Sequence, residues 1–230
     1  MVDIIPEIKK ITPTWWEFKW KEEPSKSLLQ KRVLIKNWLV AHYQDELAEI
    51  RQGYQCISVI WKNPPGKDFE VIFPTNLPSQ RVDEKTWQIP VCYGGEFGKD
   101  LDRICEIKGI SPTELIELHS NPIYRLEFYG FLPGFMYLSG LQNSLKTPRK
   151  EFPDRTVKAG SVGIGGNQTG IYPFESPGGW HLIGRTPITV FSPEENPPAN
   201  PQIGDRIQFV PISKEEFEFI LQNSPKLKPL

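Results

Sequence analysis

The sequence predicts an α+β protein made of a small N-terminal α+β domain, residues 1–80, and a mostly-β barrel domain, residues 86–230. Two observations predict this division. Strand-like alternation and helix-like spacing of apolar residues follow one another in the first part. From about residue 124 onward, the second part consists of short apolar runs separated by glycine and proline turns, as in a barrel or sandwich. The segment Leu77-Pro78-Ser79 is the expected linker.

The first domain is expected to contain a strand, one long helix and two further strands. Residues 14–20 alternate in hydrophobicity, which is typical of a half-buried strand. Ser27 begins a capping-box pattern, and helically spaced apolar residues follow it, so we expect a helix over residues 27–50. Residues 54–61 and 69–73 then form strands around a proline-rich turn.

The second domain is expected to open with a strand over residues 86–93 and two helices. The first helix covers residues 98–108, and Ser111-Pro112-Thr113-Glu114 marks the start of the second, which ends near His119. A final helix begins at Ser213. Between these helices we expect short strands over residues 124–131, 161–164, 181–183, 188–191 and 206–210.

Composition narrows the classes of partner. With 27 Lys+Arg against 28 Asp+Glu, the nearly neutral chain is not expected to bind nucleic acid or anionic lipid through charge. No apolar run approaches the ~20 residues of a membrane span, and the N-terminus lacks the apolar region of a signal peptide, so a cytoplasmic location is expected. The cysteines and histidines are too scattered to predict a metal site.

The densest glycine and proline stretch, residues 160–186, is the first candidate for a binding site. Glycine permits positive φ and close backbone approach, so backbone amides here could hold a small polar ligand. The candidate glycines are Gly160, Gly163, Gly165, Gly166, Gly178 and Gly179. The alternative is that they only form tight barrel turns. The stretch departs from the dinucleotide-binding fingerprint, and no P-loop motif occurs in the chain.

Side chains in and near this stretch extend the candidate site. Arg149 and Arg185 suit bidentate recognition of a carboxylate or phosphate, although the basic segment around Arg149 could simply be a solvated loop. Gln168 offers both a donor and an acceptor to an amide-like group. Tyr172 and Trp180 could form a flat wall for a small ring, with the alternative that Trp180 fills the barrel core.

Histidines supply the remaining candidates. His119 lies at the predicted C-terminus of a helix, where the macrodipole favours a charged imidazolium, so it is either a capping residue or, with Arg149, a candidate catalytic residue. Tyr124 begins the strand that follows and is a candidate for binding substrate. His181 stands just after the glycine turn and could hydrogen-bond a ligand.

Several long motifs occur in one order along residues 86–212. They are Tyr93-Gly94-Gly95-Glu96-Phe97-Gly98-Lys99-Asp100-Leu101, Tyr129-Gly130-Phe131-Leu132-Pro133-Gly134-Phe135-Met136-Tyr137-Leu138, Pro148-Arg149, the run from Gly160 to Tyr172, and Pro177-Gly178-Gly179-Trp180. In order and spacing this set resembles the family of the 5-oxoprolinase B component, which also includes the sporulation-kinase inhibitor Kip and part of allophanate hydrolase and urea carboxylase proteins. The chain departs from the family pattern at Lys158, where proline is usual.

The resemblance implies a cyclophilin-like barrel and a role as the B component of an ATP-dependent 5-oxoprolinase. Such an enzyme opens 5-oxoproline to glutamate, and its B component works together with a C-component-like protein and an A component. ATP is then expected at or near an interface between the components, and this chain is not expected to be active alone. Two alternatives stay open: a histidine-kinase inhibitor, and a carboxyltransferase-type component that receives biotin on another chain.

Overall fold

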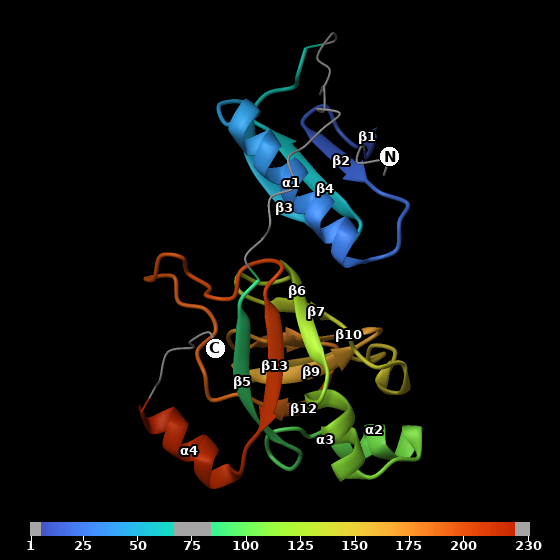
Figure 1. Ribbon diagram of the computed structural model, residues 1–230, viewed down its shortest axis with the longest axis vertical. Helices are drawn as coiled ribbons and strands as arrows, with labels where there is room; N and C mark the ends of the chain where they lie inside the picture. The colour runs from blue at the N-terminus through green and yellow to red at the C-terminus, as the bar shows by residue number, and fades with distance from the viewer. Residues whose placement is uncertain (1–5, 67–83, 224–230) are drawn as a thin grey trace. The chain divides into compact units, whose positions relative to one another are not determined.

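The computed structural model describes residues 6–66 and 84–223. The chain divides into two compact units, Met1–Val82 and Asp83–Leu230, which are described separately (Figure 1). The domain bounds expected from the sequence, 1–80 and 86–230, stay a prediction. The expected strand over residues 69–73 and the expected linker at residues 77–79 lie outside the described residues.

The first unit is a four-stranded antiparallel sheet with one helix on its face (Figure 1). The strands, in spatial order, are β1 (Glu7–Lys10), β2 (Trp15–Lys19), β4 (Cys56–Trp61) and β3 (Leu47–Gln52). The helix α1 (Lys26–Tyr43) packs against β3 and β4. The core between helix and sheet consists of Trp16, Phe18, Trp20, Leu28, Ile35, Leu39, Ile57, Val59 and Trp61.

The predicted strands over residues 14–20 and 54–61 are confirmed, but the long helix over residues 27–50 is confirmed only as far as Tyr43 and is wrong from residue 44 onward. Helix α1 ends at Tyr43, and Leu47 begins the edge strand β3, because pairing with β4 satisfies the backbone there and overrides the helical spacing of the side chains. The helix is capped by Ser25, whose hydroxyl accepts the Leu28 N–H, and not by Ser27.

The second unit is built around a closed barrel of seven strands, so the predicted combination of an α+β chain with a barrel is confirmed. Around the barrel the strands are β10 (Gln168–Ile171), β7 (Met136–Ser139), β6 (Ile123–Tyr129), β13 (Arg206–Pro211), β5 (Thr86–Tyr93), β12 (His181–Arg185) and β9 (Ser161–Gly165). All neighbours are antiparallel except β13 and β5, which run parallel and close the barrel.

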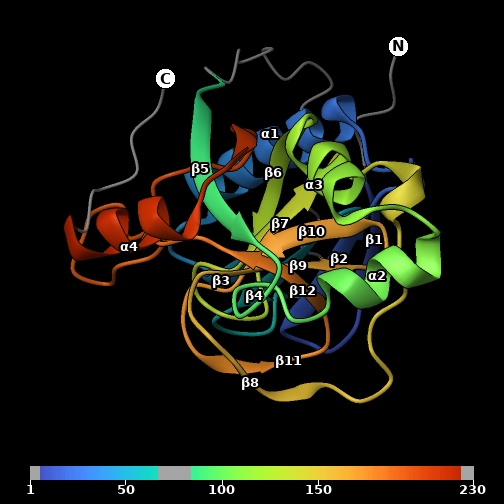
Figure 2. The same ribbon diagram turned by 90° about the horizontal axis from the view of Figure 1, so that it is seen from below.

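A two-stranded ribbon of β8 (Asp154–Val157) and β11 (Ser176–Gly178) lies outside the ring of barrel strands (Figure 2). Neither strand was predicted, because each is very short and rich in polar residues or glycine and proline. The predicted strand over residues 188–191 is absent from this part of the structure. Ile188 and Val190 are nonetheless buried in the barrel core, which explains the apolar pattern.

Three α-helices accompany the barrel within residues 84–223: α2 (Leu101–Lys108), α3 (Pro112–Ser120) and α4 (Lys214–Asn223). The predicted helix starts and stops are confirmed at two points: Ser111 caps α3 through the Glu114 N–H, and Gly109 ends α2 with a left-handed φ of 66°. Helices α2 and α3 contact each other at one end of the barrel (Figure 1). None of the helices in residues 6–66 and 84–223 is long and apolar enough to span a membrane.

Candidate functional site

Two hollows lie side by side on the second unit, separated by the segment Thr147–Pro153, which follows the short helix η1 (Asn143–Leu145). The large hollow has a volume of about 480 Å³ and is lined by Arg103, Ile107, Thr147, Pro148, Arg149, Lys150, Glu151, Phe152 and His181. The small hollow has a volume of about 170 Å³ and is lined by Phe131, Phe135, Tyr137, Arg149, Lys150, Pro153, Tyr172, Gly178, Gly179 and Trp180. Arg149 and Lys150 line both.

The segment that separates the hollows is fixed through its backbone. Thr147 exchanges two backbone hydrogen bonds with Gly166, at 3.0 and 2.7 Å. His181 Nε2 lies 2.9 Å from the Pro148 carbonyl oxygen, to which it donates, and the Lys150 N–H donates to the Gly179 carbonyl at 2.8 Å. The backbone of Arg149 is thus fixed by hydrogen bonds to the residues before and after it, and the contacts of its side chain are not needed to place that backbone.

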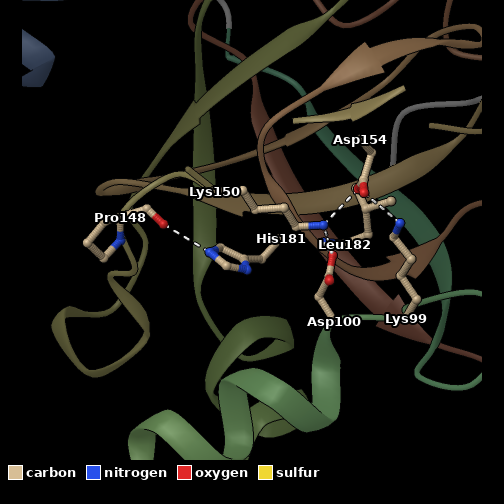
Figure 3. A network of polar contacts seen from close by, with 7 residues as sticks. All are labelled: Lys99, Asp100, Pro148, Lys150, Asp154, His181 and Leu182. Carbon is tan, nitrogen blue, oxygen red and sulfur yellow. Dashed lines mark hydrogen bonds and ion pairs between the residues drawn. The ribbon is translucent and has the colours of Figure 1, made fainter. Parts of the chain in front are cut away.

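Lys150 adds a buried ionic network below this segment (Figure 3). Its ammonium lies 2.5 Å from Asp100 Oδ2 and 2.7 Å from Asp154 Oδ2, and its side chain is 9% exposed. Lys99 also donates to Asp154, at 2.8 Å. Burial raises the pKa of the Asp154 carboxyl, but hydrogen bonds from Lys150 and Lys99 outweigh it, so this pKa is lowered overall. Two carboxylates therefore neutralise Lys150.

Arg149 is exposed, and in the described part of the chain no carboxylate pairs with it. Its guanidinium lies over the Trp180 ring at 5.7 Å and is hydrogen-bonded to Tyr137. Burial raises the pKa of Tyr137, and the nearby guanidinium opposes that rise. Because the charge of Lys150 is already satisfied, Arg149 is the cation that both hollows offer to an anionic ligand.

Aromatic rings form most of the wall of the small hollow. Phe135, Tyr172 and Trp180 are almost fully buried and meet edge to face, with the centroid of the Phe135 ring 4.9 Å from that of Tyr172 and 5.3 Å from that of Trp180. Burial raises the pKa of Tyr172 to about 12, so its hydroxyl is protonated at neutral pH. Trp180 is 4% exposed and lines the hollow, and it belongs to a core cluster with Phe135 and Tyr172 that is separate from the main core of the barrel; that it forms a wall for a ligand stays a prediction.

Most of the candidate glycines either leave space for a neighbouring aromatic side chain or hydrogen-bond to the segment of residues 147–153. A side chain at Gly165 would lie 2.6 Å from the Trp180 ring, and one at Gly178 would lie 2.5 Å from the Tyr172 hydroxyl. A side chain at Gly163 would meet the Trp180 Cβ less severely, at 3.2 Å, and Gly160 turns the chain with a φ of 79° against Thr186. Gly166 and Gly179 hold the segment as described above. Of the six, Gly178 and Gly179 line the small hollow, and the other four line neither of the two hollows described above.

His119 lies inside the barrel, fully buried, and lines neither hollow. Its Nδ1 lies 2.8 Å from the Tyr93 hydroxyl and its Nε2 lies 2.9 Å from the Thr169 hydroxyl, which itself donates to the Gly163 carbonyl. Nε2 therefore carries the proton and Nδ1 accepts. The expected charged imidazolium is wrong, because burial lowers the pKa of His119 to about 3.

The remaining candidates are dispersed. Tyr124 is buried and donates to the His119 carbonyl at 2.7 Å. Gln168 is half-buried beside the turn between β9 and β10, outside both hollows. Arg185 donates to the Ala159 carbonyl at 2.7 Å and lies over the Phe217 ring at 5.7 Å.

The structure thus brings four candidate side chains to the two hollows, Arg149, Tyr172, Trp180 and His181, together with the candidate glycines Gly178 and Gly179. Several other lining residues were not candidates from the sequence, among them Arg103 and Phe131. The motif from Tyr129 to Leu138 contained a signal for Phe131, since it stands in a turn between two glycines. Arg103 gave no signal beyond its place on a helix.

The residues near the hollows can also be compared with those that a metal ion or the phosphate groups of ATP would require. In residues 6–66 and 84–223, no three metal-ligating side chains gather. The large hollow presents Arg103 and Arg149 against a single acidic residue, Glu151, so its lining fits the charge of phosphate groups. No residue of the lining forms a P-loop.

Comparisons with known proteins identify the family. The family model of the carboxyltransferase domain, subdomain C and D, matches residues 6–200. A protein of Haemophilus influenzae, named as the B subunit of 5-oxoprolinase, is 50% identical over 85% of this chain and 84% of its own length. A protein of the same name from Bacillus subtilis is 46% identical over 62% of this chain, and the match spans 60% of that relative.

A solved structure extends the likeness at the level of the fold. The urea carboxylase of Kluyveromyces lactis superposes over 100% of this chain and 24% of its own, with a TM-score of 0.80 and 17% identity. At this identity the likeness shows the fold alone. Together with the matches in sequence, the barrel and its preceding α+β unit lead to one conclusion: the chain belongs to the family of the 5-oxoprolinase B component, whose members carry the carboxyltransferase domain of subdomains C and D.

Proposed function

We propose that this chain is the B component of an ATP-dependent 5-oxoprolinase, which converts 5-oxoproline, ATP and water to glutamate, ADP and phosphate. It works with a C-component-like protein and an A component. The names of its relatives support this assignment. The observation that carries it is Arg149, an exposed guanidinium held on a fixed backbone between two hollows and available to an anionic substrate.

The chemistry requires activation, because a lactam is a stable amide. In the proposed reaction the γ-phosphoryl group of ATP moves to the lactam oxygen and ADP leaves. Water then adds to the activated carbon and the ring C–N bond breaks, which leaves the free amine and an acyl phosphate on the side-chain carboxyl. A second water hydrolyses this acyl phosphate to glutamate and phosphate. Negative charge moves among oxygen atoms in each of these steps. A planar guanidinium such as that of Arg149 can stabilise this charge with paired hydrogen bonds.

The hollows hold no complete set of catalytic groups, and this supports a site shared with the partner components. Arg103, in the large hollow, would face the phosphate groups of ATP, which supplies the activating phosphoryl group. His181 would orient the segment through the Pro148 carbonyl. The buried thiols Cys92 and Cys105 are unpaired, which fits the reducing conditions of the cytoplasm, the proposed location.

The test is reconstitution of the complex by co-expression with a C-component-like protein and an A component, followed by an assay of 5-oxoproline-dependent ATP hydrolysis. We expect activity that requires all three chains. Arg149→Ala should lower kcat/KM by about 10²–10³-fold, as the loss of a donor to a developing negative charge does. Arg149→Lys should recover only part of it. Arg155→Ala, on the exposed face of β8 and outside both hollows, is the matched control.

Other outcomes would overturn the proposal. Full activity without this chain, or equal activity of the Arg149→Ala and Arg155→Ala complexes, would contradict it. A stable complex that ignores 5-oxoproline but carboxylates a urea-like substrate with biotin would support the carboxyltransferase alternative. Failure to assemble, combined with inhibition of a histidine kinase, would support the inhibitor alternative.

A further inference from the structure

Phe131 combines an exposed aromatic ring with a strained backbone. Its side chain is 61% exposed, and its φ of 65° makes it the one non-glycine residue with positive φ in residues 6–66 and 84–223. The Leu132 N–H donates to the Gly130 carbonyl at 2.7 Å, so Phe131 is the central residue of a γ-turn. A conformation of this kind costs about 1–3 kcal/mol and, where it occurs, often marks a functional position.

The surrounding turns impose this conformation. The Phe135 N–H donates to the Leu132 carbonyl at 3.1 Å around Pro133-Gly134, where Gly134 has a φ of 80° as the third residue of a type II turn does. The Gly130 N–H donates to the Phe135 carbonyl at 3.3 Å and closes the loop. The ring of Phe131 is therefore presented at a fixed place by the backbone rather than by burial.

The fixed ring forms one wall of the small hollow. It stands edge to face with Phe135 at 5.6 Å and with Tyr172 at 6.4 Å between ring centroids. The hollow measures about 170 Å³. An apolar cavity of about 150 Å³ holds a benzene molecule, whereas drug-sized ligands occupy about 300–1,000 Å³. The small hollow therefore has room for a single five- or six-membered ring.

The charge of the residues that line the small hollow indicates which substituent the ring of the ligand carries. Arg149 and Lys150 are the cations of the lining, and Lys150 is already neutralised by Asp100 and Asp154. The guanidinium of Arg149 is consequently the group that can pair with an anion at the edge of the hollow. A carboxylate matches its planar donors. The tyrosine hydroxyls of the lining can serve the polar atoms of the ring.

We propose that the small hollow is the binding site for a small flat ring bearing a carboxylate, with Phe131 as the wall that determines this specificity. The carboxylate pairs with Arg149 and the ring lies against the aromatic side chains. That the ligand is 5-oxoproline rests on the proposed function, since its flat lactam ring carries one carboxylate. The large hollow is left for the phosphate groups.

The experiment measures binding directly, by calorimetry and ligand-observed NMR on the full chain and on the reconstituted complex. The probes are 5-oxoproline, 2-pyrrolidinone, which lacks the carboxylate, and glutamate, which lacks the ring. We expect 5-oxoproline to bind at least tenfold more tightly than either comparison probe. Phe131→Ala should weaken it at least tenfold and raise its KM in the complex by a similar factor, while the KM for ATP stays within twofold.

Two further variants separate binding from folding. Phe131→Gly also removes the ring but suits a φ of 65°, so it should bind as weakly as Phe131→Ala and melt within about 4 °C of the wild type. Phe219→Ala removes an equally exposed ring from α4, outside both hollows, and should leave the affinity for 5-oxoproline unchanged.

The outcomes distinguish this inference from the proposed function. If the complex hydrolyses ATP in response to 5-oxoproline but the Phe131 variants retain wild-type affinity and KM, the inference fails and the function stands. If 5-oxoproline binds in a Phe131-dependent way without supporting ATP hydrolysis, the site stands and the function fails. No binding to the wild-type chain or complex overturns the inference.

Discussion

Replacing Lys150 with methionine should destabilise the barrel unit by removing one charge from a buried network. The methionine keeps most of the apolar stem, so the change isolates the ammonium. Asp100 would lose its cationic partner at 2.5 Å and retain the Leu182 N–H at 2.8 Å. Asp154 would lose a partner at 2.7 Å but keep Lys99, and its side chain is 20% exposed.

The magnitude follows from these two carboxylates. Breaking a fully buried ion pair by removing one partner costs about 3–5 kcal/mol. Asp154 is partly hydrated and keeps a cation, so we expect a loss of roughly 2–4 kcal/mol, below the upper end of that range. For a chain of this size, each kcal/mol lowers the melting temperature by about 2–4 °C. Lys150→Met should therefore melt roughly 4–16 °C below the wild type.

The assay is urea unfolding of the full chain, followed by circular dichroism and fitted for the transition of the barrel unit. Lys146→Met is the matched control, since Lys146 is exposed and directly precedes the segment, and it should change stability by less than about 0.5 kcal/mol. Adding Asp100→Asn to Lys150→Met should restore part of the loss by removing the uncompensated charge. Two results would refute the electrostatic argument. One is that Lys150→Met lowers the free energy of unfolding by less than about 1 kcal/mol. The other is that the double variant loses as much stability as the two single variants added together.

Two further predictions concern the barrel interior. Burial holds the pKa of His119 near 3 in the folded protein, whereas the same imidazole has a pKa near 6.5 in the unfolded chain. The unfolded chain therefore binds a proton first as the pH falls, so the free energy of unfolding is unaffected by the titration of this residue above pH 6.5 and decreases as the pH is lowered toward 3. Between pH 7.5 and 4.5, the wild type should lose about 2–3 kcal/mol more than His119→Gln in parallel unfolding titrations, and equal losses would contradict the assigned burial. Gly165→Ala should cost about 1–3 kcal/mol because its new methyl group meets the Trp180 ring at 2.6 Å. Gly166→Ala, which has open space but a φ of 67°, should cost about 1–2 kcal/mol from backbone strain alone, and only the Gly165 variant should shift tryptophan fluorescence.

The sequence predicted an element of this fold well where neighbouring residues alone determine its structure. The alternation of β2 and the cap of α3 depend on neighbouring residues, and both are confirmed. The helix predicted over residues 27–50 failed where pairing with a distant strand decided the outcome, at β3. The order of strands around the barrel could not be predicted, since the parallel pairing of β13 with β5 joins segments from opposite ends of the unit.

The candidate site was predictable in part. Arg149 and Trp180 were separate candidates in the sequence, and the structure brings the Arg149 guanidinium to 5.7 Å from the centre of the Trp180 ring, a contact that the sequence did not predict. The role of Gly165 was not predictable, since a glycine that accommodates a ring and a glycine that offers its backbone to a ligand look alike in a sequence. The charge of His119 was inferred from its own helix, whereas its pKa is determined by the barrel that surrounds it.

The parallel pairing of β5 with β13 has a consequence for biosynthesis. Gln88 pairs with Gln208, 120 residues later in the chain. At a translation rate of about 5–20 residues per second, β5 leaves the ribosome roughly 6–24 s before its partner exists. During that interval a strand of mostly apolar residues has an open edge. Pro90, at the centre of β5, lacks an N–H and interrupts the ladder that another nascent chain would need, so it protects the strand until the barrel closes.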